Sequence, residues 1–287
     1  MEVMLGKTAG FCYGVKRAVD GCINELKDTK DTYCLGEIVH NRQVIEDLNE
    51  KGIKFINSIN EAPTNSKVII RAHGIPKEVY EDAKERNIKV VDYTCPNVLK
   101  VHEIAEEYSN NGYFIFLTCS KKTHPEVIGI QSFCGESYIL IEKIEDVEEA
   151  LQKFYKSSLK KLLLISQTTY SMKKFDEIKK KINEQVEGKK EFVVKNTICY
   201  ATQARQDETE KLSTVVDKMI IIGGKNSSNT QKLYEVAEKN CQNAVGIETK
   251  GELAKEDFVK INKVGIMAGA STPSNIIKEV KEYVQIL

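Results

Sequence analysis

The alternation of short apolar runs with helical patterns constrains the fold of this chain more than any other feature. Runs rich in valine and isoleucine stop at small or polar residues, and a stretch with helical periodicity follows each of them. Examples are KVIIRAHG, YFIFLTCS, KLLLISQT, KMIIIGGK and KVGIMAGA. Continuous apolar strands separated by helices are typical of parallel sheets that are covered on both faces. The sequence therefore predicts an α/β protein whose ligands bind beyond the carboxyl ends of the strands.

Length and charge narrow the class of protein. The chain has 287 residues, more than one core usually supports, which predicts two or three domains. Lys+Arg and Asp+Glu both number 42, so no overall field attracts nucleic acid or an anionic membrane. We find neither an apolar run of about 18 residues nor the pattern of a signal peptide, and expect a cytoplasmic protein without a membrane or nucleic-acid partner. No heptad or apolar stripe stands out, so we expect a monomer.

Three of the eight cysteines share one local pattern, because each follows a strand-like run and precedes a helical one. Cys12, Cys95 and Cys199 lie 83 and 104 residues apart, so only tertiary structure could bring them together. Three thiolates would leave one open position on a four-coordinate metal or cluster iron, and a reducing cytosol favours such chemistry over disulfides. The alternative is burial in a core, which is usual for a free cysteine. The other cysteines fit that alternative well: Cys22, Cys34, Cys119, Cys134 and Cys241.

Histidines also gather at the predicted strand ends. His40, His73 and His124 lie at such ends, whereas His102 lies inside a helical run and is expected to be packed or solvated. The three could donate to an anion, bind a metal or move protons, and structural packing is the alternative. Glu126 follows His124 by two residues. In a water-poor cleft its pKa would rise and it could act as a general acid, although a first-turn glutamate is also favoured by the helix dipole.

Two strand ends with glycine open helices that begin with hydroxyl and amide side chains. IIIGGKNSSNT supplies Ser227, Ser228 and Asn229, and GIMAGASTPSN supplies Ser271. Backbone N–H groups at a helix N-terminus, together with such side chains, suit a phosphate or diphosphate; ordinary capping is the alternative. Neither loop has the order of a Walker loop or a dinucleotide fingerprint, which favours a small organic phosphate. The segment SQTT supplies Thr168, which could relay a proton or orient a hydroxyl.

Taken together, these segments resemble the family of 4-hydroxy-3-methylbut-2-enyl diphosphate reductases, the last enzymes of the non-mevalonate isoprenoid route. The resemblance rests on FCYGVKRA, GEIVHN, RAHG, DYTCP, THPE, SQTT, NTIC.AT..RQ and the NSSNT and GAS.P loops, in the same order from Gly10 to about Ile276. It implies three similar α/β domains with mostly parallel sheets, in a trefoil around a central iron–sulfur cluster. We expect their boundaries at 1–95, 96–197 and 198–287, with the N-terminal strand able to pack with the third domain.

The resemblance also implies a role for each matched residue. One [4Fe-4S] cluster per chain, with one open iron, would be held by Cys12, Cys95 and Cys199. The catalytic residues would be Glu126, His124 and Thr168. The substrate would be bound by His40, His73, His124, Thr168, Ser227, Ser228, Asn229 and Ser271.

The implied reaction is the reductive dehydroxylation of 4-hydroxy-3-methylbut-2-enyl diphosphate to isopentenyl and dimethylallyl diphosphate. It uses two electrons and two protons, and ferredoxin or flavodoxin would deliver the electrons. Two other functions fit the residues alone. One is a non-catalytic iron–sulfur or zinc redox sensor, in which Ser227, Asn229 and Glu126 would be dispensable. The other is a phosphatase-like enzyme that uses the histidines and a labile metal.

Overall fold

The computed structural model describes residues 1–27, 32–186 and 191–287, which form two compact units. The first unit contains residues 1–19, 39–50 and 200–287, and the second contains residues 20–38 and 51–199. Helix α1 (Tyr13–Glu25) begins in the first unit and ends in the second.

The first unit is built on one four-stranded sheet among its described residues. The strands run in the order β1-β12-β10-β11 and all neighbours are parallel. The strands are β1 (Glu2–Leu5), β10 (Lys218–Ile222), β11 (Ala244–Ile247) and β12 (Lys263–Ala268). The helices are α2 (Arg42–Glu50), α8 (Tyr200–Ser213), α9 (Ser228–Asn240) and α10 (Ser274–Gln285). The first unit also has short 3-10 turns at Lys250–Glu252 and Lys255–Phe258, and the second unit has one at Ile59–Glu61.

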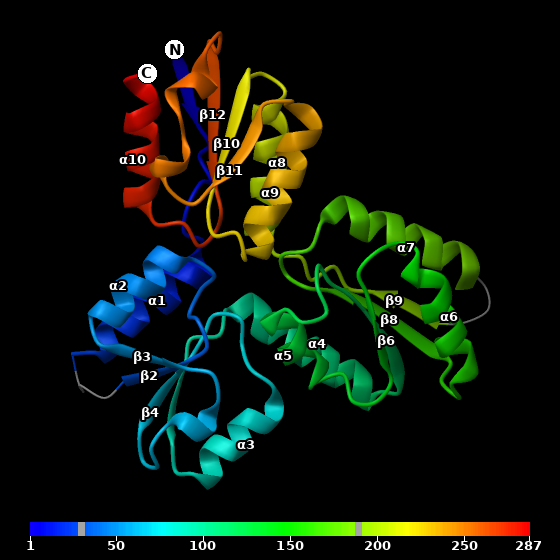
Figure 1. Cartoon of the computed structure of the whole chain (residues 1–287). Helices are drawn as coiled ribbons and strands as arrows, with labels where there is room; N and C mark the ends of the chain where they lie inside the picture. The colour runs from blue at the N-terminus through cyan, green and yellow to red at the C-terminus, as the bar shows by residue number, and fades with distance from the viewer. Residues whose placement is uncertain (28–31, 187–190) are drawn as a thin grey trace. The chain divides into compact units, whose positions relative to one another are not determined.

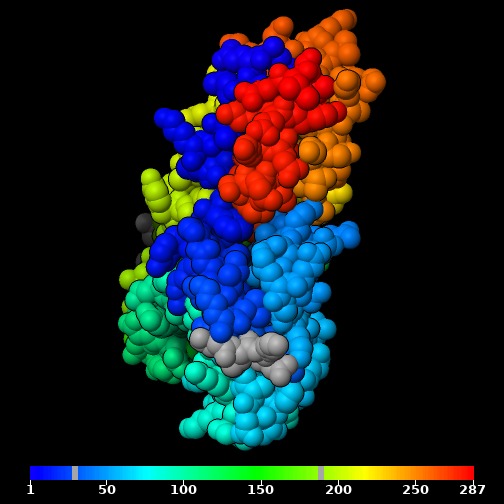
Figure 2. Space-filling model, turned by 90° about the vertical axis from the view of Figure 1, so that its left-hand side faces the viewer, coloured from blue at the N-terminus to red at the C-terminus, as the bar shows by residue number. Residues whose placement is uncertain are grey.

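Helices cover both faces of this sheet (Figure 1). Helix α10 packs on one face, where Ile277 and Val280 meet Ile220 and Ile266 of the strands. Helices α8 and α9 cover the other face, where Leu233 belongs to a second apolar cluster. Figure 2 shows the N-terminal segment beside α10 at the surface of this unit, in agreement with the contacts between β1 and α10. The chain's first strand is therefore held by its last helix.

The second unit contains two further four-stranded parallel sheets in the part of the chain described. One has the order β3-β2-β4-β5 and the other β7-β6-β8-β9. The strands of the first are β2 (Thr32–Leu35), β3 (Ile53–Ile56), β4 (Lys67–Ile70) and β5 (Lys89–Asp92). The strands of the other are β6 (Tyr113–Thr118), β7 (Tyr138–Ile141), β8 (Lys161–Ser166) and β9 (Glu191–Val194).

The helices of the second unit again lie on the sheet faces. They are α3 (Lys77–Glu85), α4 (Pro96–Asn110), α5 (Pro125–Gln131), α6 (Asp146–Lys156) and α7 (Met172–Val186). Helices α6 and α7 cover one face of the β6–β9 sheet around Phe154 and Phe175. Helices α4 and α5 cover its other face around Val101 and Ile130. Two apolar clusters thus sandwich this sheet, as a parallel sheet requires.

The strand registers align the carboxyl ends within each sheet. Thr118 of β6 pairs with Ile141 and Ser166, and Ile222 of β10 pairs with Ile247 and Ala268. The prediction of an α/β fold with three parallel sheets is confirmed. The trefoil arrangement around a cluster and the boundaries at 1–95, 96–197 and 198–287 stay predictions, and β1 is observed to pair with β12. Within residues 1–27, 32–186 and 191–287, no helix is long and apolar enough to cross a membrane.

Candidate functional site

In the first unit, the loop from β1 to α1 fixes the position of Cys12. Its backbone follows the exit of β12, because the N–H groups of Gly6 and Cys12 donate to the carbonyls of Ile266 (2.9 Å) and Ala270 (3.2 Å). The half-buried Cys12 immediately precedes α1, and its own carbonyl accepts the first helical bond from Lys16 at 2.9 Å. The thiol therefore starts from a backbone that is held on both sides.

Cys95 and Cys199 are held in the same manner in the second unit. The N–H of Cys95 donates to the carbonyl of Ala72 at 3.0 Å, and that of Cys199 to the carbonyl of Thr168 at 3.0 Å. Cys95 is the N-cap residue of α4, and Cys199 immediately precedes α8. Each of the three predicted ligand residues thus stands directly before a helix, and helix N-termini favour negative charge.

Burial separates these three cysteines from the other five. Cys12, Cys95 and Cys199 are partly exposed, whereas the rest are buried. Burial raises the pKa of Cys119 and of Cys134 to about 12, so those thiols stay protonated at neutral pH. Three accessible thiols, free of disulfides, are a donor set that suits iron–sulfur or zinc binding. Their assignment as ligands stays a prediction.

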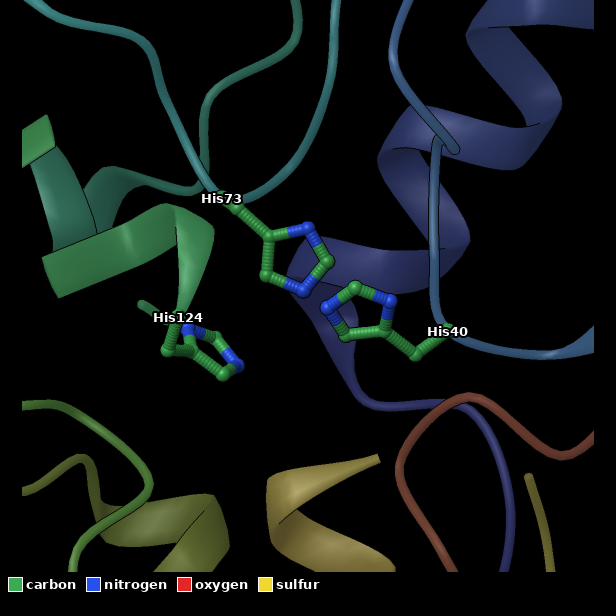
Figure 3. A group of neighbouring side chains, drawn as sticks. All are labelled: His40, His73 and His124. Atoms are coloured by element: carbon green, nitrogen blue, oxygen red, sulfur yellow. The ribbon is translucent and has the colours of Figure 1, made fainter. Parts of the chain in front are cut away.

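His73 and His124 lie together in the second unit (Figure 3). Their ring centroids are 5.5 Å apart, and the ring planes meet at 77°. His124 is the N-cap residue of α5, and its Nδ1 accepts a hydrogen bond of 3.2 Å from the N–H of Glu126. That bond requires an unprotonated Nδ1, so the neutral ring carries its proton on Nε2. His124 can therefore donate a hydrogen bond from Nε2 without leaving its capping position.

Glu126 is the most perturbed acid of this region. Its side chain is 2 % exposed in the first turn of α5, and one carboxylate oxygen accepts the N–H of Thr168 at 2.7 Å. Burial raises the pKa of Glu126 to about 7, although hydrogen bonds from the backbone and the hydroxyl of Thr168 oppose this rise. The carboxyl group can thus hold or release a proton near neutral pH. Glu126 and Thr168 are 42 residues apart in sequence and are brought together by the fold.

The first unit gathers three of the predicted anion-binding residues at the N-terminus of α9. Ser227 is the N-cap residue of α9, and its hydroxyl accepts the N–H of Thr230 at 3.3 Å. Ser228 begins the helix and is partly exposed. Asn229 is 4 % exposed, and its Nδ2 has no hydrogen-bond partner among the described residues. Because a buried amide donor is costly to leave unsatisfied, this group suits an anionic ligand at the helix N-terminus.

The backbone of His40 lies between the two predicted anion loops in the same unit. Its carbonyl accepts a hydrogen bond of 3.1 Å from the Oγ of Ser271. A Cβ on Gly224 would lie 2.5 Å from that carbonyl oxygen, so only glycine allows the approach. The predicted residues His40, Ser271 and the Gly224 loop are thus brought together, and their binding roles stay predictions.

Two residues of α8 to which no sequence pattern assigned a role contact the loop before Cys12. Arg205 is 5 % exposed and donates to the carbonyl of Gly10 at 2.7 Å, and Glu208 accepts the N–H groups of Lys7 at 2.6 Å and Thr8 at 2.8 Å. Both residues therefore hold the loop that leads to Cys12. Arg205 is the arginine of the segment NTIC.AT..RQ, and its place in that segment of the family resemblance is the sequence feature that could have drawn attention to it.

His102 is buried, so of the two expected environments the packed one is observed. Burial lowers its pKa to about 4, and its ring stacks on Phe133 with centroids 4.4 Å apart. It is neutral at physiological pH and belongs to the packing of α4.

A comparison with known proteins identifies the family. The family model described as LytB protein matches residues 3–285. The chain belongs to the LytB protein family. This is a family of iron–sulfur proteins.

Similar proteins of the LytB family extend over the whole chain. A protein of Clostridioides difficile (strain 630) named 4-hydroxy-3-methylbut-2-enyl diphosphate reductase is 42 % identical over 100 % of both chains. A solved structure of (E)-4-hydroxy-3-methyl-but-2-enyl diphosphate reductase, described as the terminal enzyme of the non-mevalonate pathway, is 41 % identical over 100 % of both chains, with a TM-score of 0.71. The E-1-hydroxy-2-methyl-but-2-enyl-4-diphosphate reductase of Plasmodium falciparum is 32 % identical and covers 100 % of this chain and 87 % of that one, with a TM-score of 0.89. These relatives give no support to the alternative of a non-catalytic redox sensor.

Proposed function

We propose that this protein is a 4-hydroxy-3-methylbut-2-enyl diphosphate reductase that forms isopentenyl and dimethylallyl diphosphate. The names of full-length relatives support the choice of substrate and reaction. The observation that carries the chemistry is the buried carboxyl group of Glu126, whose pKa of about 7 suits an acid that works at neutral pH.

The three partly exposed cysteines are the residues that would hold the cofactor. Cys12, Cys95 and Cys199 supply three thiols, so a [4Fe-4S] cluster bound by them, one per chain, would keep one iron without a protein ligand. When bound, such a cluster supplies electrons and a Lewis-acidic iron. The buried cysteines are poor alternatives, because burial holds the pKa of Cys119 and Cys134 far above neutral.

Proton delivery falls to Glu126 and Thr168. The reaction takes up two electrons and two protons, breaks the bond from the allylic carbon to its hydroxyl oxygen and releases water. Near pH 7 the carboxyl group of Glu126 is partly protonated, and its hydrogen bond to the Thr168 hydroxyl gives the proton a neighbouring acceptor. After release of the proton, the N–H of Thr168 at 2.7 Å stabilises the carboxylate. His124, with its proton on Nε2, can orient the substrate hydroxyl.

The diphosphate of the substrate would be bound by local groups, because a chain of zero net charge has no overall field to offer. The N-terminus of α9 presents backbone N–H groups, and the buried Nδ2 of Asn229 has no hydrogen-bond partner in the described part of the chain. The remaining proposed contacts come from His40, His73, Ser227, Ser228 and Ser271. Binding energy from this remote group orients the reacting carbon.

Ferredoxin or flavodoxin is the proposed electron donor, since an iron–sulfur cluster, when bound, would accept electrons one at a time. We also propose that the protein works in the cytoplasm as a monomer. The donor follows from the family resemblance and the cytoplasm from the reducing chemistry that the thiols need. The monomer follows from the sequence, in which no heptad or apolar stripe stands out.

Anaerobic purification followed by iron and sulfide analysis tests the proposal most directly. The protein should carry iron and sulfide and should convert the allylic alcohol diphosphate to both products with a reduced viologen dye. A colourless, iron-free protein would refute the cluster, and an iron-bearing protein without turnover would favour a sensor. Release of inorganic phosphate from the substrate would favour the phosphatase-like alternative instead.

A further inference from the structure

Arg205 connects the backbone segments that lead to two of the predicted ligand cysteines. Its Nη2 donates to the carbonyl of Gly10 at 2.7 Å, and its Nη1 donates to the carbonyl of Ala201 at 2.8 Å. Gly10 is two residues before Cys12, and Ala201 is two residues after Cys199. One guanidinium group is thus hydrogen-bonded within two residues of each of these cysteines.

The segment around Gly10 has an unusual backbone conformation and a long backbone hydrogen bond. Gly10 has a φ of 100°, a left-handed conformation that glycine adopts readily, and a Cβ there would lie 2.9 Å from Ile277 Cδ1. The N–H of Gly10 reaches the carbonyl of Ala268 only at 3.4 Å, so the bond from Arg205 to the carbonyl of Gly10 is the shorter of the two. Glu208, one turn further along α8, holds the preceding Lys7 and Thr8. Two side chains of α8 therefore help to hold the loop that leads to Cys12.

The charge of Arg205 is also significant. The side chain is 5 % exposed, and an arginine guanidinium keeps its positive charge in proteins. In a medium of low dielectric constant such a charge acts strongly on groups nearby. A cluster held by thiolates becomes more negative when it is reduced, and charge and hydrogen bonding around a cluster set its reduction potential.

We propose that Arg205 is a positioning residue of the cysteine site that both holds the Cys12 loop and, through its buried positive charge, stabilises the reduced state of the bound cluster. This inference rests on the proposed function, since it needs a cluster on the three cysteines. It adds a residue that determines how easily the electron donor can reduce the protein. In each transfer the donor loses one electron and the cluster gains it, and no covalent bond of Arg205 changes.

Three variants of the whole protein test the two roles separately. R205Q removes the charge, R205K keeps the charge but cannot reproduce the two-pronged hydrogen bonding, and K211Q removes an exposed positive charge from the same helix. Each is purified anaerobically beside the wild type. Iron per chain, the rate of iron loss to a chelator and the midpoint potential in an EPR-monitored redox titration are measured, and far-UV circular dichroism checks folding.

The expected results differ for each variant. R205Q should lose iron faster than the wild type and show a more negative midpoint potential, because the reduced state has lost a stabilising charge. R205K should lose iron faster but keep a potential near that of the wild type. K211Q should match the wild type in both measurements.

The outcomes that would overturn the inference are equally distinct. A wild-type midpoint potential in R205Q would refute the charge role, and wild-type iron retention in R205K would refute the positioning role. If R205Q does not fold, R205K alone still decides. This variant keeps the positive charge, so a midpoint potential clearly more negative than that of the wild type would contradict tuning by charge. A wild type that holds no iron would refute the proposed function itself, whereas a cluster-bearing, active wild type with unchanged variants would refute only the role of Arg205.

Discussion

Replacing Glu126 with glutamine tests the proposed proton delivery directly. Glutamine keeps the shape of the side chain and its oxygen can still accept the Thr168 N–H bond of 2.7 Å, but it has no proton to give up near pH 7. A well-placed general acid contributes about 10²- to 10⁴-fold to a rate. Turnover of the E126Q holoenzyme should fall by about that factor, while its iron content stays that of the wild type.

The pKa of Glu126 predicts the pH profile of the wild type as well. With a pKa of about 7, the protonated fraction is about 0.9 at pH 6 and about 0.1 at pH 8. Turnover with a reduced viologen dye should therefore decline by nearly tenfold between these pH values. E126D, which keeps the carboxyl group on a shorter side chain, should retain this pH dependence at lower turnover. A flat wild-type profile, or full turnover in E126Q, would refute the acid role.

The same pKa makes stability depend on pH. Burial raises the pKa of Glu126 from 4.5 to about 7, so between these values the native state keeps a proton that the unfolded chain has lost. The contribution to stability is greatest below pH 4.5 and is lost as the pH rises towards 7, by about 3 kcal/mol in total. Urea unfolding at several pH values should show this loss in the wild type and not in E126Q. Equal pH dependence in both would contradict the burial of an ionisable carboxyl group.

Four further substitutions have definite expected outcomes. C95S should lose most of its iron in anaerobic preparations, whereas C119A, which removes a buried thiol, should keep it; equal iron in both would contradict the ligand assignment. N229A removes a buried amide donor, and because a hydrogen bond to a charged group contributes about 1.5–3 kcal/mol, KM for the diphosphate substrate should rise by about tenfold or more; an unchanged KM would exclude contact with the substrate. G224A places a methyl group 2.5 Å from the carbonyl oxygen of His40, so the free energy of unfolding should fall by about 1–3 kcal/mol and the melting temperature should fall with it. An unaltered melting temperature would refute the close packing.

The apolar runs in the sequence predicted the interior of each sheet better than its edges. The five quoted runs correspond to β4, β6, β8, β10 and β12, and each of these strands has a neighbour on both sides. Their residues are almost all buried, for example throughout β6. Edge strands such as β1 and β9 are partly exposed and have weaker patterns. The pairing of β1 with β12 joins the two ends of the chain, and no local pattern encodes such a contact.

The candidate site shows the same limit. The sequence could place Glu126 in the first turn of a helix, but its burial depends on residues such as Thr168, 42 positions away. The environment of His102 stayed open for the same reason, because the ring's neighbour Phe133 lies on a different part of the chain. The residue types therefore allowed an acid role to be proposed for Glu126. The burial that raises its pKa could be determined only from the tertiary structure.

The buried side of helix α8 is mostly polar. Thr202, Arg205 and Thr209 are all buried and recur at helical spacing, so a pattern based on apolar residues would direct this side to solvent. The Oγ1 of Thr209 donates to the carbonyl of Arg205 at 2.7 Å, and the guanidinium donates to the carbonyl of Gly10. Apolar side chains at these positions would make contacts with no preferred geometry. The hydrogen bond from Arg205 instead holds the Gly10 loop at a defined distance and angle from α8. A helix that holds the loop of Cys12 in one conformation has reason to bury polar groups, and this departure from the usual amphipathic pattern supports the proposed role of α8 at the candidate site.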